Sequence, residues 1–276
     1  MLSLVSHISF AYFVCLILPG MDMNQSTVAA AGNLEGKMFL YSKPELLTVE
    51  DHGRLGLTAS ERPFDFVKSI RVVPIAAAEI ASAQKNYPII FSDLKTPALL
   101  AVVSVLDGVN LFVDDNGKWD ESAYLPAYIR CHPFALAPRP NDQYAVVIDR
   151  AASVITENAE QPFFDGKDLA PPIQARVDFC AQFSAHRPAT KALCDKLVEL
   201  DLLSGQQATY KPDAGGEEQS IGSYVAVDFD KVKELDASTL RQLHLDGTLS
   251  AIYAHRFSLE NWFRLLERRN RRQSAG

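Results

Sequence analysis

Residues 87–113 read YPIIFSDLKTPALLAVVSVLDGVNLFV, and this stretch decides the fold class. Residues 89–91 and 98–106 form two short apolar runs, separated by a polar segment that contains Pro97. Apolar runs of this length without alternation are typical of strands that are buried on both faces. We therefore expect a small internal sheet at this point in the chain.

A turn signal follows these two runs. Residues 110–113 and Trp119 flank the segment Asp115-Asn116-Gly117. Asn and Gly tolerate the positive φ angles that a tight hairpin turn requires. The pattern predicts a β-hairpin, and the strand-like texture continues through residues 124–134 and 144–148.

One helix is predicted within this strand-rich part of the chain, at residues 75–87. Pro74 is allowed in the first turn of a helix, and the alanines at positions 76–78 are strong helix formers. Pro88 ends the predicted helix, because proline has no backbone N–H to continue the ladder.

From about residue 171 the apolar spacing changes to that of helices. Val177, Cys180 and Ser184 share one helical face, and Leu193 and Leu197 belong to the stripe of a second helix. A β-hairpin is predicted next, with strands at residues 206–211 and 224–229 around the Gly-rich loop 213–219. A short helix follows, capped by Asp236 or Ser238 and ended by Gly247. The last predicted helix begins near residue 250 or 259 and ends at 269.

The elements together predict an α+β fold. Its N-terminal part consists mainly of antiparallel strands with one inserted helix, and its C-terminal part is helical with a β-hairpin. We expect a single domain over residues 38–270, strand-rich over 38–165 and helix-rich over 171–270. The pattern leaves open whether these two parts share one core or form two.

Residues 1–37 are interpreted as a leader or a disordered N-terminus. The apolar run 8–18 is too short to span a bilayer. A signal peptide has basic residues before its apolar run, but no Lys or Arg precedes this one. Met21 and Met23 offer an alternative start of translation. We expect no stable membrane span and a cytoplasmic location, with export through the apolar run as the alternative.

Composition and motifs exclude several function classes. The net charge is −7, so we expect no nucleic-acid partner. The chain contains no Gly-rich phosphate loop, no GxSxG, no HExxH and no paired-Cys motif. The one basic cluster, near the C-terminus, is predicted to offset the dipole of the last helix and solvate its end, or to contact an acidic partner; it consists of Arg264, Arg268, Arg269, Arg271 and Arg272.

The six histidines are spread singly along the chain. His244 and His255 would align on one continuous helix, but Gly247 interrupts it. We expect no metal and no cofactor, and a metal site made from His52, His132 and an acidic residue stays open as the alternative.

The candidate ligand-binding residues are mostly aromatic and fall within fifty residues of one another: Tyr87, Asn110, Phe112, Trp119, Tyr128 and Arg130. One interpretation is that the rings fill the core around the sheet. The other is a pocket whose rings supply contact area while Arg130 binds a carboxylate. On the strand expected here, Tyr128 and Arg130 would point to the same face.

The order of several segments resembles the SapC family of bacterial proteins over roughly residues 38–268. The segments that carry the resemblance are His52-Gly-Arg-Leu, Val73-Pro-Ile-Ala-Ala-Ala-Glu-Ile, Asn86-Tyr-Pro-Ile-Ile-Phe, Gly108-Val-Asn-Leu-Phe-Val-Asp with Gly117-Lys-Trp, Tyr124-Leu-Pro-Ala-Tyr-Ile-Arg-Cys-His-Pro-Phe, Leu243-His-Leu-Asp-Gly-Thr-Leu and Tyr253-Ala-His-Arg-Phe-Ser-Leu-Glu-Asn-Trp. The apolar run near the N-terminus is a departure, since the family pattern does not require it.

The resemblance implies a setting more than a mechanism. The family takes its name from a gene associated with export of surface-layer protein, and relatives are often encoded beside halogenase-like proteins, cupin-like proteins and outer-membrane receptors. It implies no catalytic residues. We expect a non-catalytic adaptor that binds a peptide or protein and is linked to the envelope, the S-layer or export. The alternative is a metal-dependent or accessory enzyme acting with the halogenase-like or cupin-like neighbours.

Overall fold

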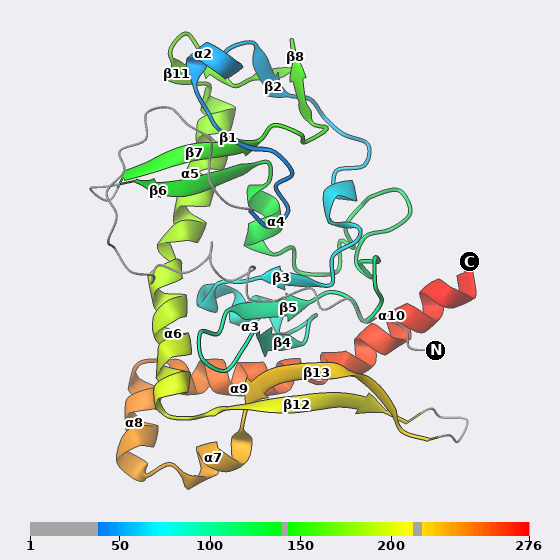
Figure 1. Ribbon diagram of the computed structural model, residues 1–276, viewed down its shortest axis with the longest axis vertical. Coiled ribbons are helices and arrows are strands. Elements are labelled where there is room, and N and C mark those ends of the chain that lie inside the picture. The colour runs from blue at the N-terminus through cyan, green and yellow to red at the C-terminus, as the bar shows by residue number, and fades with distance from the viewer. Residues whose placement is uncertain (1–37, 140–142, 212–216, 276) are drawn as a thin grey trace, which may run out of the picture.

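The computed structural model describes residues 38–139, 143–211 and 217–275 (Figure 1). Helices and antiparallel strands are combined in these ranges, which confirms the predicted α+β class. The leader or disordered segment 1–37 lies outside the described residues, as does most of the Gly-rich loop 213–219.

The largest sheet has five strands in the order β12-β13-β4-β5-β3. Its centre is the stretch that the sequence singled out: β4 (Ile89–Phe91) pairs with β5 (Leu99–Val102), and every residue of β5 is buried. The edge strand β3 (Val72–Pro74) pairs with β5. The predicted hairpin, β12 (Leu203–Tyr210) and β13 (Gln219–Val227), joins the same sheet where Val225 pairs with Phe91.

Within the described residues 38–139 and 143–169, the structure has three smaller antiparallel sheets. One has the order β1-β7-β6, another the order β8-β2-β9, and the last is a two-stranded pair. Their strands are β1 (Pro44–Leu46), β2 (Leu55–Leu57), β6 (Phe134–Arg139), β7 (Gln143–Asp149), β8 (Ile155–Glu157), β9 (Gln161–Pro162), β10 (Phe164–Asp165) and β11 (Asp168–Leu169). At Gly56 of β2, a Cβ would lie 2.2 Å from the carbonyl oxygen of Gln161, so only glycine fits between the neighbouring strands.

The helices cluster in the C-terminal part, as the spacing predicts. Those of the C-terminal part are α5 (Pro171–Ala185), α6 (Arg187–Glu199), α7 (Phe229–Glu234), α8 (Ala237–Leu245), α9 (Thr248–Ser258) and α10 (Asn261–Ala275). Short helical segments occur earlier: α2 (Val49–His52), η1 (Asp65–Val67), η2 (Ala77–Glu79), α3 (Ile80–Ala83) and α4 (Ala127–Cys131). The Asp236 side chain caps α8, and Gly247 follows it with φ of 82°.

Four local predictions need correction. The helix expected at 75–87 is shorter, because Ile75 still donates to Leu99 and continues the β3–β5 pairing. The last helix is two helices, α9 and α10. The hairpin around Gly117 is reduced to one bridge, Val113 to Trp119, within a loop. The strand expected at 124–134 contains α4, and β6 begins only at Phe134.

The buried apolar residues form two clusters. The larger one surrounds the five-stranded sheet and extends from Tyr41 to Leu265. The smaller one joins β2, β6 and α5, and Phe183 packs against both clusters. Each cluster takes residues from both the strand-rich and the helix-rich parts of the chain. The change of texture near residue 170 is therefore not a boundary between separate cores.

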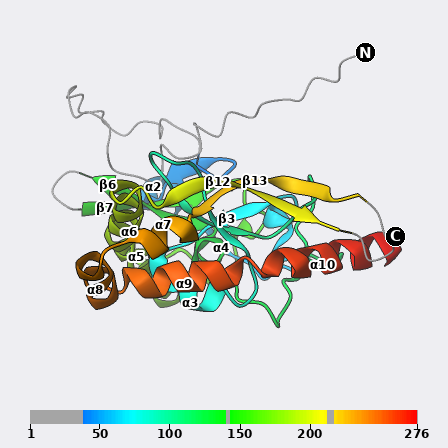
Figure 2. The same ribbon diagram turned by 90° about the horizontal axis from the view of Figure 1, so that it is seen from below.

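Three polar side chains attach the C-terminal helices to the central sheet. Asn261 donates through Nδ2 to the carbonyl oxygens of Gln84, at 2.8 Å, and Tyr87, at 3.2 Å. The backbone N–H of Ile89 donates to Ser258 Oγ at 3.0 Å. Figure 2 shows α9 and α10 following one another along one side of the molecule. These buried hydrogen bonds hold the junction of α9 and α10 against the end of α3 and the start of β4.

His255 is the third of these side chains. The N–H of Val227 donates to its Nε2 at 3.1 Å, and its ring lies 5.4 Å from that of Phe91 and 6.3 Å from that of Phe229. Burial lowers the pKa of His255 to about 4. In the unfolded chain the imidazole is protonated below about pH 6.5, whereas in the folded protein it stays neutral down to about pH 4. The contribution of His255 to the free energy of unfolding is therefore constant above pH 6.5 and decreases as the pH drops from 6.5 towards 4.

We predict that the free energy of unfolding decreases by about 2 kcal/mol between pH 7 and pH 5, at about 1.4 kcal/mol per unit below the unfolded pKa. His255→Gln should remove most of this slope, and His244→Gln, at an exposed position of α8, should leave it intact. Urea unfolding at several pH values measures both. An unchanged slope in His255→Gln would contradict the assignment.

Candidate functional site

Four of the predicted ligand-binding residues are buried close together: Tyr87, Phe112 and Trp119 belong to the larger apolar cluster, and Asn110 is a buried polar residue beside Phe112. Tyr87, Asn110, Phe112 and Trp119 are exposed by 0, 1, 2 and 7 %, respectively. Phe112 contacts the Tyr87 ring edge-on, with centroids 4.7 Å apart, and stacks on Trp119 at 5.9 Å. Asn110 donates to the Val67 carbonyl oxygen and accepts from the Phe112 N–H. The structure thus brings these residues together as packing around the sheet.

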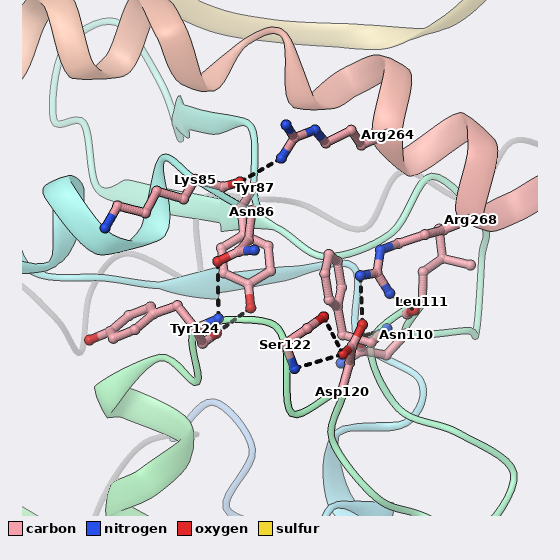
Figure 3. Close-up of polar contacts among 11 residues, drawn as sticks. Lys85, Asn86, Tyr87, Asn110, Leu111, Asp120, Ser122, Tyr124, Arg264 and Arg268 are labelled. Carbon is pink, nitrogen blue, oxygen red and sulfur yellow. Dashed lines mark hydrogen bonds and ion pairs between the residues drawn. The ribbon is translucent and has the colours of Figure 1, made fainter.

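Tyr87 and Asn86 hold the loop that follows Trp119 (Figure 3). The Tyr87 hydroxyl donates to the carbonyl oxygen of Tyr124, and Asn86 Oδ1 accepts from the Tyr124 N–H at 3.0 Å. Burial raises the pKa of Tyr87, so the phenol stays protonated and keeps its role as a donor. These hydrogen bonds engage the Tyr87 hydroxyl and the side-chain oxygen of Asn86.

The arginines of α10 close the other side of this loop. Arg268 lies 4.1 Å above the Phe112 ring and donates to Asp120 at 2.6 Å (Figure 3). Arg272 donates to the Val113 carbonyl oxygen at 2.7 Å and pairs with Asp115. The sequence predicted that this basic cluster offsets the helix dipole and solvates the terminus, with contact to an acidic partner as the alternative. Two of its side chains, Arg268 and Arg272, instead bind residues 111–120 of the same chain.

Tyr128 and Arg130 do not share a strand face, since both lie on α4. The helix forms here because the buried carboxylate of Glu79 accepts from the Ala127 N–H at 2.8 Å and fixes the first turn. Residues two positions apart point to nearly opposite sides of a helix. Tyr128 is buried and donates to the Phe39 carbonyl oxygen, whereas Arg130 is exposed and stacks on Phe179 at 4.2 Å.

Arg130 lines a cleft of about 790 Å³, which lies within the volume range of ligand-binding sites. The cleft is bounded by residues 57–66, the end of α4, the end of β7 with the turn that follows it, and α5. Its apolar walls include Leu57, Phe64, Phe66, Leu125 and Ile129. Its polar groups include Arg62, Arg130, His132, Asp149, Glu160 and Arg176.

His132 and Asp149 form a buried pair in the wall of this cleft. His132 Nε2 lies 3.3 Å from Asp149 Oδ2, and the His132 ring stacks on Phe66 with centroids 3.9 Å apart. Asp149 also accepts from the N–H groups of Ser42, Lys43 and Ala151. Burial alone would raise the pKa of Asp149, but these donors outweigh it and lower the pKa to about 2. The ionised carboxylate therefore orients the imidazole.

A second hollow, of about 1020 Å³, shares part of its lining with the cleft. The shared residues are Ser60, Arg62, Pro63, Phe64 and Leu125. Trp119 lines the second hollow, and Arg130 lines the cleft. Two of the predicted residues therefore border neighbouring spaces that have lining residues in common.

The comparison with protein families adds the decisive observation. A family model described as SapC matches residues 47–265, which is most of the chain and includes every residue of the cleft from Leu57 to Arg176. The chain belongs to the SapC family. No curated protein and no solved structure shows a significant match.

Within this SapC-family fold, sequence reasoning missed Asp149 and Arg176 as site residues and considered His132 only as a metal ligand with His52. They come from three distant segments, and no local spacing connects them. A signal was present for one of them, because His132 follows Arg130 within the segment Tyr124-Leu-Pro-Ala-Tyr-Ile-Arg-Cys-His-Pro-Phe. The partners became visible only where β7 and α5 pack beside α4.

The described residues also show whether side chains are arranged as metal ligands and whether a helix could span a membrane. No group of three or more His, Cys, Asp and Glu side chains within residues 38–139, 143–211 and 217–275 is arranged to hold a metal. His52 and His132, which the sequence left open as joint ligands, each pair with a separate carboxylate, Glu45 and Asp149. Across the same described ranges, no helix is both long and apolar enough to span a bilayer.

We predict that Phe112→Ala lowers the free energy of unfolding by about 3–5 kcal/mol, because it removes a ring that is buried between Tyr87, Trp119 and Arg268. Phe263→Ala is the matched control: this ring is 63 % exposed, and its loss should change stability by less than about 0.5 kcal/mol. Chemical unfolding measures both changes. A small effect at Phe112 would show that the ring is not part of the packed core.

For Asp149 we predict that Asp149→Asn destabilises the protein by about 2 kcal/mol at pH 7, because it weakens charge-assisted hydrogen bonds to buried donors. The folded pKa lies below the ordinary value, so the contribution of Asp149 is present above about pH 4 and is lost as the pH falls towards 2. The variant should therefore lose less stability than the wild type in that window. Asp195→Asn, in an exposed ion pair with Lys191, is the control and should change little.

Proposed function

We propose that this SapC-family protein is a non-catalytic binding protein, which recognises a segment of peptide or protein in the cleft beside Arg130. The observation that carries the proposal is the cleft itself, in which partly exposed rings lie next to guanidinium groups. Phe64, Phe66 and Leu125 supply apolar contact area, and Arg130 and Arg176 supply charged donors. Recognition sites for peptides combine these two kinds of group.

The second hollow supports an extended ligand. It begins at the same wall of residues 60–64 and continues towards Trp119, Lys118 and Glu121. A bound peptide that passes over residues 60–64 would contact both spaces through successive residues of the peptide. A small metabolite would need only one of them.

The chemistry of the thiols supports a role without nucleophilic catalysis. The side chain of Cys180 and burial together raise the pKa of Cys131, and burial raises the pKa of Cys194 to about 12. A thiol is a useful nucleophile only as a thiolate, which a raised pKa disfavours. Both groups are buried and do not line the cleft.

The cellular location and origin of the proposed ligand are inferred from the family alone. The family name links these proteins to export of surface-layer protein, so we propose a ligand from the envelope or the export route. We place the protein in the cytoplasm, where it would meet such a ligand before export, and keep export of the protein itself through the apolar run 8–18 as the alternative.

The test is selection of peptides on the immobilised full chain from a displayed library of random dodecapeptides, followed by fluorescence anisotropy with the enriched sequences. Ala151→Trp places an indole in the cleft from an exposed position and should weaken binding by at least about tenfold. Ala192→Trp, at an exposed position of α6 outside the cleft, should bind as the wild type does. Peptides that bind both variants equally would place recognition elsewhere, and the absence of any enriched peptide would remove the proposal.

A further inference from the structure

Two arginines from neighbouring helices line the cleft. Arg130 extends from α4 and Arg176 from α5, both are exposed, and both line the cleft. The two helices pack against each other. The Arg130 guanidinium lies 4.2 Å above the ring of Phe179, which is three residues after Arg176 and therefore on the same side of α5. Stacking on Phe179 thus holds the charge of Arg130 within one helical turn of Arg176.

Neither of these arginines is neutralised by an acidic residue in the described part of the chain. The other charges of the cleft are engaged differently. Arg62 pairs with Asp65 at 2.7 Å, and Asp149 accepts from His132 and three backbone N–H groups. Glu160 lines the cleft and is exposed, but it makes no ion pair with either arginine. Two like charges beside each other repel, unless an anion lies between them.

The geometry of Arg130 leaves its donors available. A guanidinium that stacks on a ring uses its π-face, whereas its N–H groups lie in the plane and point outward from the edge. Two such groups can bind the two oxygens of a carboxylate through parallel, charge-assisted hydrogen bonds. The alternation of rings and charges in the cleft suits a peptide that carries one such group.

We propose that Arg130 and Arg176 form a carboxylate subsite, so that the ligand of the cleft is a peptide bound through a free carboxylate. The inference rests on the proposed function for its peptide, but the subsite itself can be tested alone. Both the C-terminus of a peptide and an acidic side chain supply such a carboxylate, and the probes below distinguish these two sources. A polyanion is disfavoured by the net charge of −7 and by Glu160 in the same cleft.

The experiment uses small carboxylates and observes the arginine Nε–Hε signals by NMR in the full-length protein. The probes are N-acetylglycine, which mimics a C-terminus, the α-amide of N-acetylglutamate, which mimics a side chain, and N-acetylglycinamide, which lacks the charge. We expect saturable shifts of the Arg130 and Arg176 signals with one or both acids and none with the amide. The acid that binds more tightly identifies the source of the carboxylate.

Arg130→Gln and Arg176→Gln should each raise the dissociation constant for the acid by about tenfold or more, since each removes a charge-assisted hydrogen-bond donor. Arg241→Gln removes the same charge from an exposed position on α8 and should leave the constant unchanged. Circular dichroism of each variant checks the fold. Equal shifts with acid and amide, or equal losses in Arg241→Gln and Arg130→Gln, would overturn the subsite.

The two proposals fail in different ways. If selected peptides bind in the cleft but their amidated and uncharged forms bind equally well, only the carboxylate subsite is wrong. If the small acids bind at Arg130 and Arg176 while no library peptide is sensitive to Ala151→Trp, the subsite stands and the peptide-binding function is wrong.

Discussion

The buried carboxylate of Asp149 is the constraint on which the candidate site depends. It ends β7 and accepts hydrogen bonds from the segment before β1, from His132 after α4, and from the turn at Ala151. A buried charge without such donors would cost several kcal/mol, so these segments stay together only as a set. Ser42, His132 and Ala151 all line the cleft. The shape of the cleft therefore follows from the need to satisfy one carboxylate.

Aromatic rings have two different roles in this protein: some pack the core, and one supports a charged side chain at the surface. The rings of Tyr87, Phe112 and Trp119 close the large core, and Arg268 completes their packing from α10. Another ring, that of Phe179, is only partly buried and carries the guanidinium of Arg130 at the surface. The difference is one of accessibility: Tyr87 and Phe112 are packed on all sides and Trp119 keeps only a small exposed fraction, whereas the partly buried ring of Phe179 positions a charge at the surface.

Membership in the SapC family gives this arrangement a context but no mechanism. The matched region extends from residue 47 to residue 265 and includes the five-stranded sheet and all of the cleft except Leu40 and Ser42. Function must then be argued from the groups that meet in the site. Those groups are guanidinium groups, a His–Asp pair, a glutamate and apolar walls, and the proposed binding role rests on them.

The sequence alone determined the elements whose signals are local. The buried strands β4 and β5, the helices α5 and α6, the β12–β13 hairpin and the caps of α8 follow from apolar spacing, turn residues and capping side chains, which act over a few neighbouring positions. The sequence also identified Arg130 as a candidate. It did not separate packing rings from binding rings, because both have the same composition and spacing.

Features that depend on contacts between distant segments of the chain were set by the tertiary structure. Residues 127–131 became a helix because Glu79, nearly fifty positions earlier, holds the N–H of Ala127. Arg176 met Arg130 because α5 packs on α4, and Asp149 met His132 because β7 returns beside β6. These contacts join segments that are far apart in the chain, and their energy comes from burial and from the satisfaction of buried polar groups, which no local pattern encodes.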